Sequence, residues 1–504
     1  MRELLEKKFN LYVDILLHLE QAGGKTVLFN IEKELHVSKV TLANEVHNLN
    51  NIFHVLNIPA EIIMSKRGLL YQKHDTYHSK ELIPFFMKES ILYKYLLTLI
   101  APTLTSTQSF CVEQHISVSY FYKQNNLLKQ ILKKYHISIN TTKNCLLGEE
   151  KNIRSFLFTF FWTTFLNIDW PHNILKEECE SILNTILGIS KSTLSMVDFE
   201  KMLHIIAITN QRILSRNFIN KQETLLDISL NEDETQIFKG TKNAIFRLYS
   251  DRYSLSPTTL ENEIKFFYTL INTHLFDYEE AIYMETTYNY VRNKNGYAYQ
   301  LAEFITNNIY EYLGVDLSTN FEFKLDLIKI HNHMFVFPSL PIPYDVKKMK
   351  EKYLAEYPTA YYIIVKIIKK MEKHFNLSIT KTPDNLFLEV HYILLLCNYL
   401  DLYTFNKKTS IYISCTAGRA AAHEITTELL YRFGKKIEIH RELLDTTDVS
   451  ITECKLSCSE NTHILYFEYP PSAMFFNQLE YQINQSFSKK NHTYIKQLHS
   501  ILFE

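Results

Sequence analysis

The amino-acid sequence predicts a mainly α-helical chain that ends in a small α/β domain. Only 10 glycines and 12 prolines occur among 504 residues, which favours long helices over a turn-rich β protein. A chain of this length exceeds one compact core, so several domains are expected. A hydrophobic pattern recurs in its middle, and a strand, loop, helix and strand follow in order near its end. The predicted architecture has two amino-terminal (winged) helix-turn-helix domains, two copies of a helical domain and the small α/β domain.

The balance of charge excludes a general attraction to nucleic acid. Lysine plus arginine number 54 and aspartate plus glutamate 55, so any contact with DNA must come from a local patch. The first nine residues are charged throughout, unlike a cleavable signal, and no uncharged apolar run approaches the length of a membrane span. The seven cysteines lack zinc-ligand spacing. We therefore expect a cytoplasmic protein without metal, cofactor or enzymatic activity.

Residues 1–75 predict a winged helix-turn-helix. Apolar residues at helical spacing over 28–35 are followed by Ser38, a residue type favoured at helix N-caps, and by a second helix over 39–53. That helix is expected to turn Val40, Val46, Leu49 and Phe53 toward the core. Its opposite face, which would meet the major groove, comprises Ser38, Lys39, Thr41, Asn44, Glu45 and Asn48. Residues 61–71 predict a β-hairpin with a basic tip, Lys66 and Arg67, suited to phosphate contact.

Residues 76–160 predict a second helix-turn-helix, with helices over 109–114 and 119–135 and a turn between them. Ser119 and Lys123 begin its second helix and are candidate DNA contacts. Arg154 and six lysines outnumber three glutamates here, so we expect a stronger positive field than on the first unit. For this second unit the alternative is a solvated basic face, and for the first unit it is a helical pair that binds only protein.

The middle of the chain contains an internal repeat. Residues 203–212 match 325–334 at an offset of 122 residues, and 263–270 resemble 384–391 at an offset of 121. So long a period predicts two copies of a helical domain, over residues 161–285 and 286–404. The repeat marks two positions in each copy. They are occupied by His204 and Leu270 in the first copy and by Asp326 and His391 in the second.

At these positions the chain resembles the phosphotransferase regulation domain (PRD), whose early and late histidines are phosphorylated by the sugar-phosphotransferase relay. The resemblance implies that the first copy keeps only its early histidine, His204, and the second only its late one, His391. A neutral imidazole nitrogen accepts a phosphoryl group near physiological pH, and the added charge can repack an interface. Structural histidines are the alternative at both positions.

The surroundings expected for these residues differ. His204 shares a helix stripe with Lys201, Gln211 and Ser215, which predicts a partly wet edge accessible to a donor protein. His391 lies among apolar residues, which predicts the core or a subunit interface. Asp326, at the position of His204 in the second copy, is expected to pair with a cation or to mimic a fixed negative charge.

Residues 405–504 predict an α/β domain with a partly parallel sheet, from strands over 411–415, 436–440 and 464–468 and a helix over 420–433. The segment from Cys415 to Gly418 is similar to the phosphocysteine loop of phosphotransferase IIB components. In that loop a cysteine accepts phosphate over backbone N–H groups. Residues 419–421 lack the hydroxyl residues usual after the glycine. The favoured interpretation is a degenerate module used for dimerisation, with Cys415 as a candidate phosphocysteine.

The order of these domains resembles the Mga/AtxA-type virulence transcription regulators of Gram-positive bacteria across essentially the whole chain. Residues 147–150 and 154–156 are similar to a stretch shared by that family. The resemblance implies a homodimer, formed through the second PRD-like copy and the IIB-like domain, that binds AT-rich double-stranded promoter DNA. It also implies phosphorylation by the phosphocarrier protein of the sugar-phosphotransferase system. No membrane partner is expected.

Two other functions fit parts of the sequence. A PRD-containing RNA-binding antiterminator begins with a small β-sheet domain, whereas residues 1–57 here are helical in pattern. A IIB-type phosphocarrier would pass phosphate through Cys415 to a sugar. On the DNA-binding interpretation, no run of arginines is placed for bidentate contacts with guanine, which favours readout of DNA shape.

Overall fold

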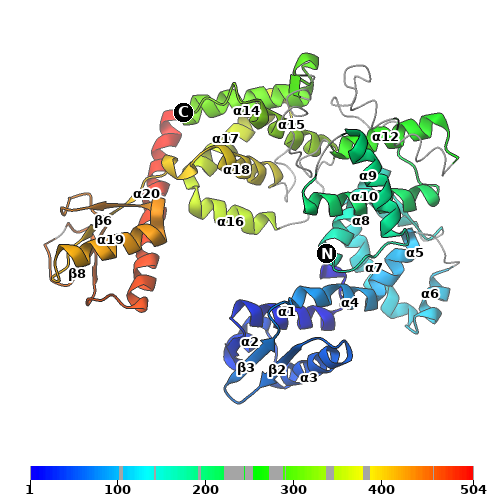
Figure 1. Cartoon of the computed structure of the whole chain (residues 1–504), viewed down its shortest axis with the longest axis horizontal. Helices are drawn as coiled ribbons and strands as arrows, with labels where there is room; N and C mark the ends of the chain where they lie inside the picture. The colour runs from blue at the N-terminus through cyan, green and yellow to red at the C-terminus, as the bar shows by residue number, and fades with distance from the viewer. Residues whose placement is uncertain are drawn as a thin grey trace. The chain divides into compact units, whose positions relative to one another are not determined.

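The computed structural model forms two compact units, residues 1–280 with 336–343, and residues 281–335 with 344–504 (Figure 1). It describes residues 2–100, 106–140, 143–190, 194–220, 243, 254–271, 288–289, 291–336, 345–377, 386–457 and 459–502, of which 189–190, 268–271 and 501–502 as backbone alone. The repeat positions 270 and 384 therefore lie outside the described side chains. Within the described ranges, no helix is both long and apolar enough to cross a membrane.

The first winged helix confirms the predicted helix pair and hairpin. Its elements are η1 (Arg2–Leu4), α1 (Lys7–Gln21), β1 (Lys25–Val27), α2 (Leu28–Leu35), α3 (Lys39–Val55), β2 (Ala60–Met64), β3 (Gly68–Lys73) and η2 (Ser79–Glu81). Helix α3 begins after Ser38, whose Oγ accepts a hydrogen bond from the Thr41 N–H at 3.1 Å. The antiparallel sheet has the order β1-β3-β2.

Two close contacts hold this sheet and α3 together. Gly68 lies opposite Val27, and a Cβ at position 68 would lie 2.1 Å from the carbonyl oxygen of Thr26, so only glycine permits β1 to pair there. Asn50 of α3 donates to the Ile62 carbonyl at 2.8 Å and accepts from the Ile62 N–H at 2.9 Å. These contacts tie α3 and β1 to the hairpin.

The second winged helix repeats this architecture and includes a wing whose strands had not been placed from the sequence. Its elements are α4 (Leu82–Glu89), α5 (Ile91–Ile100), α6 (Thr107–Glu113), α7 (Val118–Lys133), and the antiparallel strands β4 (Ser138–Asn140) and β5 (Cys145–Leu147). His36 and His115 both adopt a left-handed φ of 53° in the turns before α3 and α7. Ser117 caps α7 as Ser38 caps α3, so α7 begins at Val118 and not at Ser119.

Helix α4 connects the two winged helices. The Phe86 ring packs against Phe9 and Tyr12 of α1, with ring centroids 5.1 and 5.6 Å apart. At the end of α4 the buried Ser90 hydroxyl donates to the Leu4 carbonyl at 2.6 Å. These contacts join residues more than seventy positions apart, so α4 braces the first winged helix against the second.

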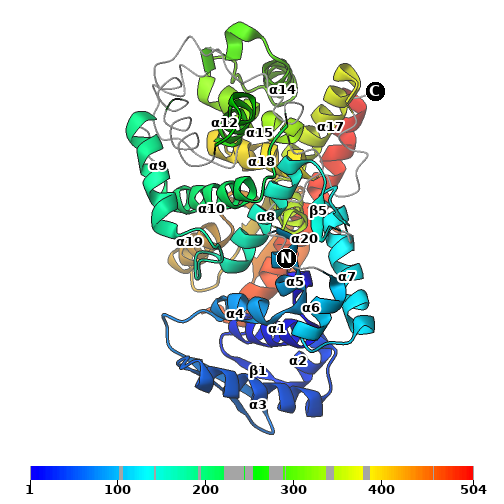
Figure 2. The same ribbon diagram turned by 90° about the vertical axis from the view of Figure 1, so that its right-hand side faces the viewer.

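Helices α8 (Glu150–Phe165), α9 (Lys176–Ser190), α10 (Met196–Leu214) and α12 (Pro257–Ile271) follow in the same unit. Helix α10 packs against both α8 and α9 (Figure 2). The α8 side of this packing is aromatic, with Phe156, Phe160, Phe161 and Phe165 all buried.

Four charged side chains are buried together at one end of these helices and form the ion cluster, Glu150, Arg154, Arg212 and Glu263. Glu150 accepts from Arg212 at 2.8 and 2.9 Å and from Arg154 at 3.1 Å. Arg154 also forms a bidentate pair with Glu263, at 2.6 and 2.9 Å. Arg212 donates to the Ile100 carbonyl at 3.3 Å. The cluster therefore ties α8, α10 and α12 to the end of α5.

The second compact unit of the chain begins with five helices. They are α14 (Tyr297–Leu313), α15 (Phe321–Val336), α16 (Val346–Glu356), α17 (Pro358–Phe375) and α18 (Phe387–Tyr399). The matching stretches of the repeat both lie in helices, 203–212 in α10 and 325–334 in α15. Their corresponding side chains are buried in both, Ile206 with Ile328 and Asn210 with Asn332.

The carboxyl-terminal elements are η4 (Leu402–Phe405), β6 (Thr409–Ile413), α19 (Arg419–Phe433), η5 (Gly434–Lys436), β7 (Ile437–His440), β8 (Val449–Thr452), β9 (His463–Tyr466) and α20 (Ala473–Leu502). The strand order is β7-β6-β8-β9, and every adjacent pair is parallel, so the prediction of a partly parallel sheet is corrected. Strand β8 was missed because it is only four residues long, although Val449 and Ile451 alternate with Ser450 and Thr452. Leu429 of α19 and Leu479 of α20 complete the core against Ile411 and Val449.

We predict that Glu150→Ala lowers the free energy of unfolding of the first unit by about 3–5 kcal/mol, because it leaves two buried arginines with one carboxylate. The charges of Arg212 and Arg154 outweigh burial and lower the pKa of Glu150. Since this folded pKa lies below the ordinary value of 4.5, the stabilisation is present at neutral pH and lost as the pH falls below about 4.5. Denaturant unfolding would measure both effects.

The matched control is Glu149→Ala, which removes the neighbouring exposed carboxylate and should change stability by less than about 0.5 kcal/mol. Equal losses in the two variants would show that the ion cluster does not support the fold.

Candidate nucleic-acid interface and buried histidines

Helix α3 presents the polar face that the sequence predicted, with one correction. Ser38, Lys39 and Asn44 are exposed and Thr41 is half-buried. Val40 was placed in the core, but it is 71% exposed, and Leu42 is fully buried in its stead. The reason is angular: two residues along a helix differ by about 200°, so Val40 and Leu42 point in opposite directions.

Besides the predicted Asn44, the exposed α3 face includes Val40, His47 and Asn51, which were not predicted as DNA contacts. Glu45 and Asn48 are only half-exposed and hydrogen bond to each other at 3.0 Å. The fully exposed stripe runs through Val40, Asn44, His47 and Asn51, with His47 and Asn51 joined at 3.2 Å. Their spacing of three and four residues is the signal that could have found them.

At the hairpin tip, both predicted basic residues are exposed to solvent. Lys66 and Arg67 are exposed between β2 and β3. The Ser65 hydroxyl shapes the turn, because its oxygen accepts from the N–H groups of Arg67 at 3.2 Å and Gly68 at 3.3 Å. The tip thus offers two cations on a defined backbone, which is suited to phosphate contact.

Ser119 and Lys123 are both exposed on α7. The exposed stripe continues through Tyr122, Asn126, Lys129 and Lys133. Lys143 is exposed beside β5 at the second wing. Arg154, however, is buried in the ion cluster and cannot add to the surface field, which corrects the charge count made from the sequence. The positive surface of this unit therefore consists of lysines.

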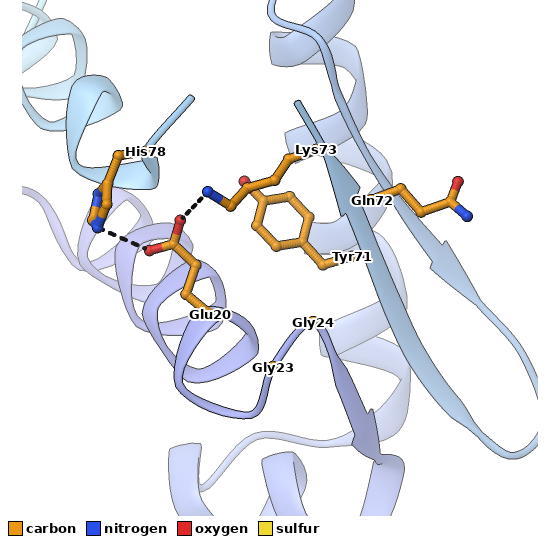
Figure 3. A pocket seen from close by; sticks show the side chains of 7 residues that line it. All are labelled: Glu20, Gly23, Gly24, Tyr71, Gln72, Lys73 and His78. Atoms are coloured by element: carbon orange, nitrogen blue, oxygen red, sulfur yellow. Dashed lines mark ion pairs between the residues drawn. The ribbon is translucent and has the colours of Figure 1, made fainter. Parts of the chain in front are cut away.

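A shallow pocket of about 580 Å³ lies in the first winged helix, lined by Glu20, Gly23, Gly24, Tyr71, Gln72, Lys73 and His78 (Figure 3). Glu20 reaches between Lys73 and His78, which lie 3.3 and 3.5 Å from its carboxylate oxygens. It also accepts from the Ser79 N–H at 3.1 Å and the Ser79 hydroxyl at 2.9 Å. Because Glu20 is already surrounded by donors, the pocket acts as a structural junction between α1, β3 and η2.

His204 does not lie on a wet edge, which contradicts the predicted accessibility. It is fully buried on α10, and its Nδ1 lies 2.8 Å from Nε2 of the buried His172. The Trp162 and Trp170 rings flank it, with centroids 5.8 and 5.0 Å away. The helix stripe suggested exposure because His172 and Trp170 come from a connection that a single-helix pattern does not contain. Burial lowers the pKa of His204 to about 4, so the ring is neutral at physiological pH.

His391 lies in the core of the second unit, one of the two environments predicted for it. Its Nδ1 donates to the Phe387 carbonyl at 2.7 Å, and its ring lies 4.1 Å from the Phe387 ring. Burial lowers the pKa of His391 to about 4, although the bond to Phe387 acts to raise it. With Nδ1 protonated, Nε2 carries the lone pair that a phosphoryl group would need.

Asp326 pairs with a cation, which is one of the two roles predicted for it. Lys329 Nζ lies 3.8 Å from its Oδ1, and the Tyr399 hydroxyl donates to its Oδ2 at 3.2 Å. The second copy therefore carries a carboxylate at the position that His204 occupies in the first.

Cys415 lies two residues beyond the end of β6, and not within the strand as predicted. A carboxylate of the chain itself fills the loop around it: Glu453, just after β8, accepts from the Thr416 hydroxyl at 2.6 Å and from the Thr416 N–H. Burial and the negative charge of Glu453 raise the pKa of the Cys415 thiol, although a hydrogen bond from the Ala417 N–H opposes them. A protonated thiol beside a carboxylate is a poor phosphate acceptor.

Comparison with known proteins agrees with this architecture. Residues 75–161, the second winged helix, match the Mga helix-turn-helix domain. The chain is 21% identical over 402 residues to the capsule synthesis positive regulator AcpA of Bacillus anthracis, a match covering 75% of this chain and 77% of that protein. It is 25% identical over 186 residues to the anthrax toxin expression trans-acting positive regulator of the same organism, covering 36% of this chain and 38% of that protein.

The fold and the exposed helix faces define a protein with tandem winged helices followed by helical and α/β domains. The resemblance stated from the sequence is confirmed by these comparisons: the chain is similar to virulence regulators of the Mga/AtxA type.

The buried histidines of the second unit predict acid sensitivity. Burial lowers the pKa of His331 to about 4, of His333 to about 3 and of His391 to about 4. Each folded pKa lies below the ordinary 6.5, so their contribution to stability is complete above pH 6.5 and falls on acidification toward pH 4. We expect thermal unfolding of the second unit to shift to lower temperature between pH 7 and pH 5.

A variant without one titrating ring tests the cause. His331→Gln retains a donor and an acceptor near the Tyr392 hydroxyl and the Ala298 carbonyl. It should reduce the slope of stability against pH by up to about 1.4 kcal/mol per pH unit. An unchanged slope would assign the acid sensitivity to other groups.

Proposed function

We propose that the chain is a transcription regulator that binds double-stranded promoter DNA through both winged helices. The observation that carries this proposal is the duplication: two winged helices in tandem each present a polar recognition helix and a wing tip with an exposed lysine. Recognition helices of this kind enter the major groove. The names of the similar proteins, both positive regulators, point the same way.

The chemistry of the exposed stripes favours AT-rich DNA and contacts to phosphate. On α3 the stripe offers amides, an imidazole and the Val40 methyl groups, which suit adenine edges and the thymine methyl group. On α7 it offers a tyrosine and lysines. The exposed face of neither helix carries an arginine placed for bidentate contact with guanine.

The test is a gel-shift titration of the full chain on an AT-rich promoter fragment across a salt series. We expect affinity to fall steeply with salt. Lys66→Ala/Arg67→Ala should weaken binding to all sequences and reduce the slope of log affinity against log salt by about two, because each lost phosphate contact removes about one unit. Lys347→Ala/Lys348→Ala removes the same charge from the exposed surface of α16 and serves as the control.

The result that contradicts a role for the first wing is unchanged affinity and slope in the Lys66/Arg67 variant. If wild-type chain binds no fragment at any salt concentration, the proposal of a DNA-binding regulator fails as a whole.

The second winged helix is tested separately by Lys123→Ala/Lys129→Ala on α7. Both side chains are exposed on the same stripe, so we expect a loss of affinity at least as large as that of the wing variant. Lys134→Ala, which removes a lysine paired with Glu3 beyond the end of α7, should have little effect. Equal affinity in wild type and both variants would confine DNA contact to the first winged helix.

We propose further that phosphorylation of His204 and His391 by the phosphocarrier protein of the sugar-phosphotransferase system regulates this activity. Both rings are neutral at physiological pH, the form in which a nitrogen lone pair is available. Asp326 supplies a fixed negative charge at the position equivalent to His204, which fits a second copy that does not require early phosphorylation. Incorporation of labelled phosphate, compared among wild type, His204→Ala and His391→Ala, tests both sites.

The proposed homodimer, through the second PRD-like copy and the α/β domain, is tested by sedimentation of the full chain.

Of the rival functions, the antiterminator requires an amino-terminal β-sheet domain, whereas α1, α2 and α3 occupy most of the first 55 residues. A IIB-type carrier requires Cys415 as phosphate acceptor, where Glu453 already occupies the loop. The geometry therefore favours the DNA-binding regulator.

A further inference from the structure

Both tryptophans of the chain lie beside His204, and one of them is on the connection that covers it. This connection, residues 166–175 between α8 and α9, is called the cover segment here. It carries Trp170 and His172, whose rings lie 4.7 Å apart, and the Trp170 indole N–H donates to the Ile174 carbonyl at 2.7 Å within the same segment. The side chains of Trp170 and His172 therefore cover one side of the buried His204 ring.

A single hydrogen bond joins the cover segment to the His204 ring, between His172 Nε2 and His204 Nδ1. Within the described chain, the two outer nitrogens, His172 Nδ1 and His204 Nε2, have no hydrogen-bond partner. Two neutral imidazoles sharing one bond must leave one N–H and one lone pair unpaired at these positions. An unpaired buried polar atom costs free energy that contact with solvent or a ligand would recover. Besides the ring contacts of Trp170 and His172, the closed arrangement is therefore held at the His204 ring by one hydrogen bond, and two unsatisfied atoms oppose it.

We propose that the cover segment is a latch on His204, closed by the His172–His204 hydrogen bond, that must open before a phosphoryl donor can reach the ring. This inference rests on the proposed phosphorylation of His204. The reason is steric: His204 is 0% exposed, so the phosphorus of a donor cannot approach either ring nitrogen while the segment is closed. His172 is a positioning residue, because it acts by holding the segment in place.

With the latch open, the transfer step is a simple exchange of nitrogen–phosphorus bonds. The unprotonated nitrogen of His204 attacks the phosphorus of the phosphohistidine on the phosphocarrier protein. The donor's nitrogen–phosphorus bond breaks, and its electron pair returns to the donor ring. The product carries about two negative charges, and Lys176, the cation that acts on the His204 ring, is already paired with Glu200 at 3.0 Å, so the charged group cannot return to the aromatic cage without a further cation. Phosphorylation therefore holds the latch open.

The cover segment is also tied to the brace between the winged helices. Asp169, next to Trp170, forms an ion pair with Lys88 on α4. Two residues earlier on α4, Phe86 packs against Phe9 and Tyr12 of the first winged helix. Opening the latch moves Asp169 away from Lys88. The state of His204 is thereby communicated to the helix that positions the first winged helix.

The test compares initial rates of phosphorylation of the full chain by the phosphocarrier protein. His172→Phe keeps an aromatic ring against Phe161 and Trp170 but cannot hydrogen bond, and it should be phosphorylated at His204 roughly fivefold faster, the factor equivalent to one neutral hydrogen bond. His172→Gln retains a hydrogen-bonding group and should remain near the wild-type rate. His204→Ala in each background identifies the phosphate attached at His204.

A second measurement reports the latch without any phosphorylation. In a Trp162→Phe background, Trp170 is the only tryptophan, so quenching of its fluorescence by acrylamide follows exposure of the cover segment. Adding His172→Phe should increase the quenching constant, and adding His172→Gln should not. Circular dichroism of each variant establishes that the helices are intact.

The two hypotheses fail in different ways. If wild type and His172→Phe take up no phosphate at His204, the proposed regulation is wrong, and the quenching result alone decides whether the latch exists. If His204 is phosphorylated but His172→Phe is no faster than wild type and no more quenched, the latch is wrong and phosphorylation stands.

Discussion

The buried pairing of Glu150, Arg154, Arg212 and Glu263 is the constraint on which the first unit depends. Each charge alone would be too costly to bury, and together they are neutral and nearly saturated with hydrogen bonds. Their geometry requires α8, α10, α12 and the end of α5 to be in place at the same time. Glu150 is also the first residue of α8, three residues after the wing strand β5 ends. The wing of the second winged helix is thus attached to a point that helices α8, α10 and α12 hold.

The same two helices carry the His204 site. On α8, Trp162 follows Arg154 by eight residues, and on α10, Arg212 follows His204 by eight, so the site lies about 12 Å from the ion cluster. One end of the helix pair is fixed by strong electrostatics. The other is closed by aromatic rings and a single neutral hydrogen bond. A change in charge at His204 therefore acts on the weaker end, where the cover segment reaches α4 through Asp169.

The second unit carries carboxylates at two positions where the proposed phosphoryl chemistry would otherwise act. Asp326 occupies the position equivalent to His204 and pairs with Lys329, so that site holds a permanent carboxylate. In the α/β domain, Glu453 accepts the Thr416 hydrogen bonds that a phosphate would otherwise receive. Both replacements put a carboxylate where phosphoryl chemistry would place its own negative charge.

Local signals in the sequence determined the helix-turn-helix pairs, the first wing, the capping serine Ser38, the two-copy repeat and the order of β6, α19 and β7. These features arise from contacts between residues close in the chain, which periodicity and capping report directly. Only the tertiary structure decided that Arg154 is buried and that His172 and Trp170 close over His204. Those outcomes depend on partners 32 to 109 residues away, such as His172 with His204 and Arg154 with Glu263. A pattern confined to one helix has no information about the side chains that another segment places against it.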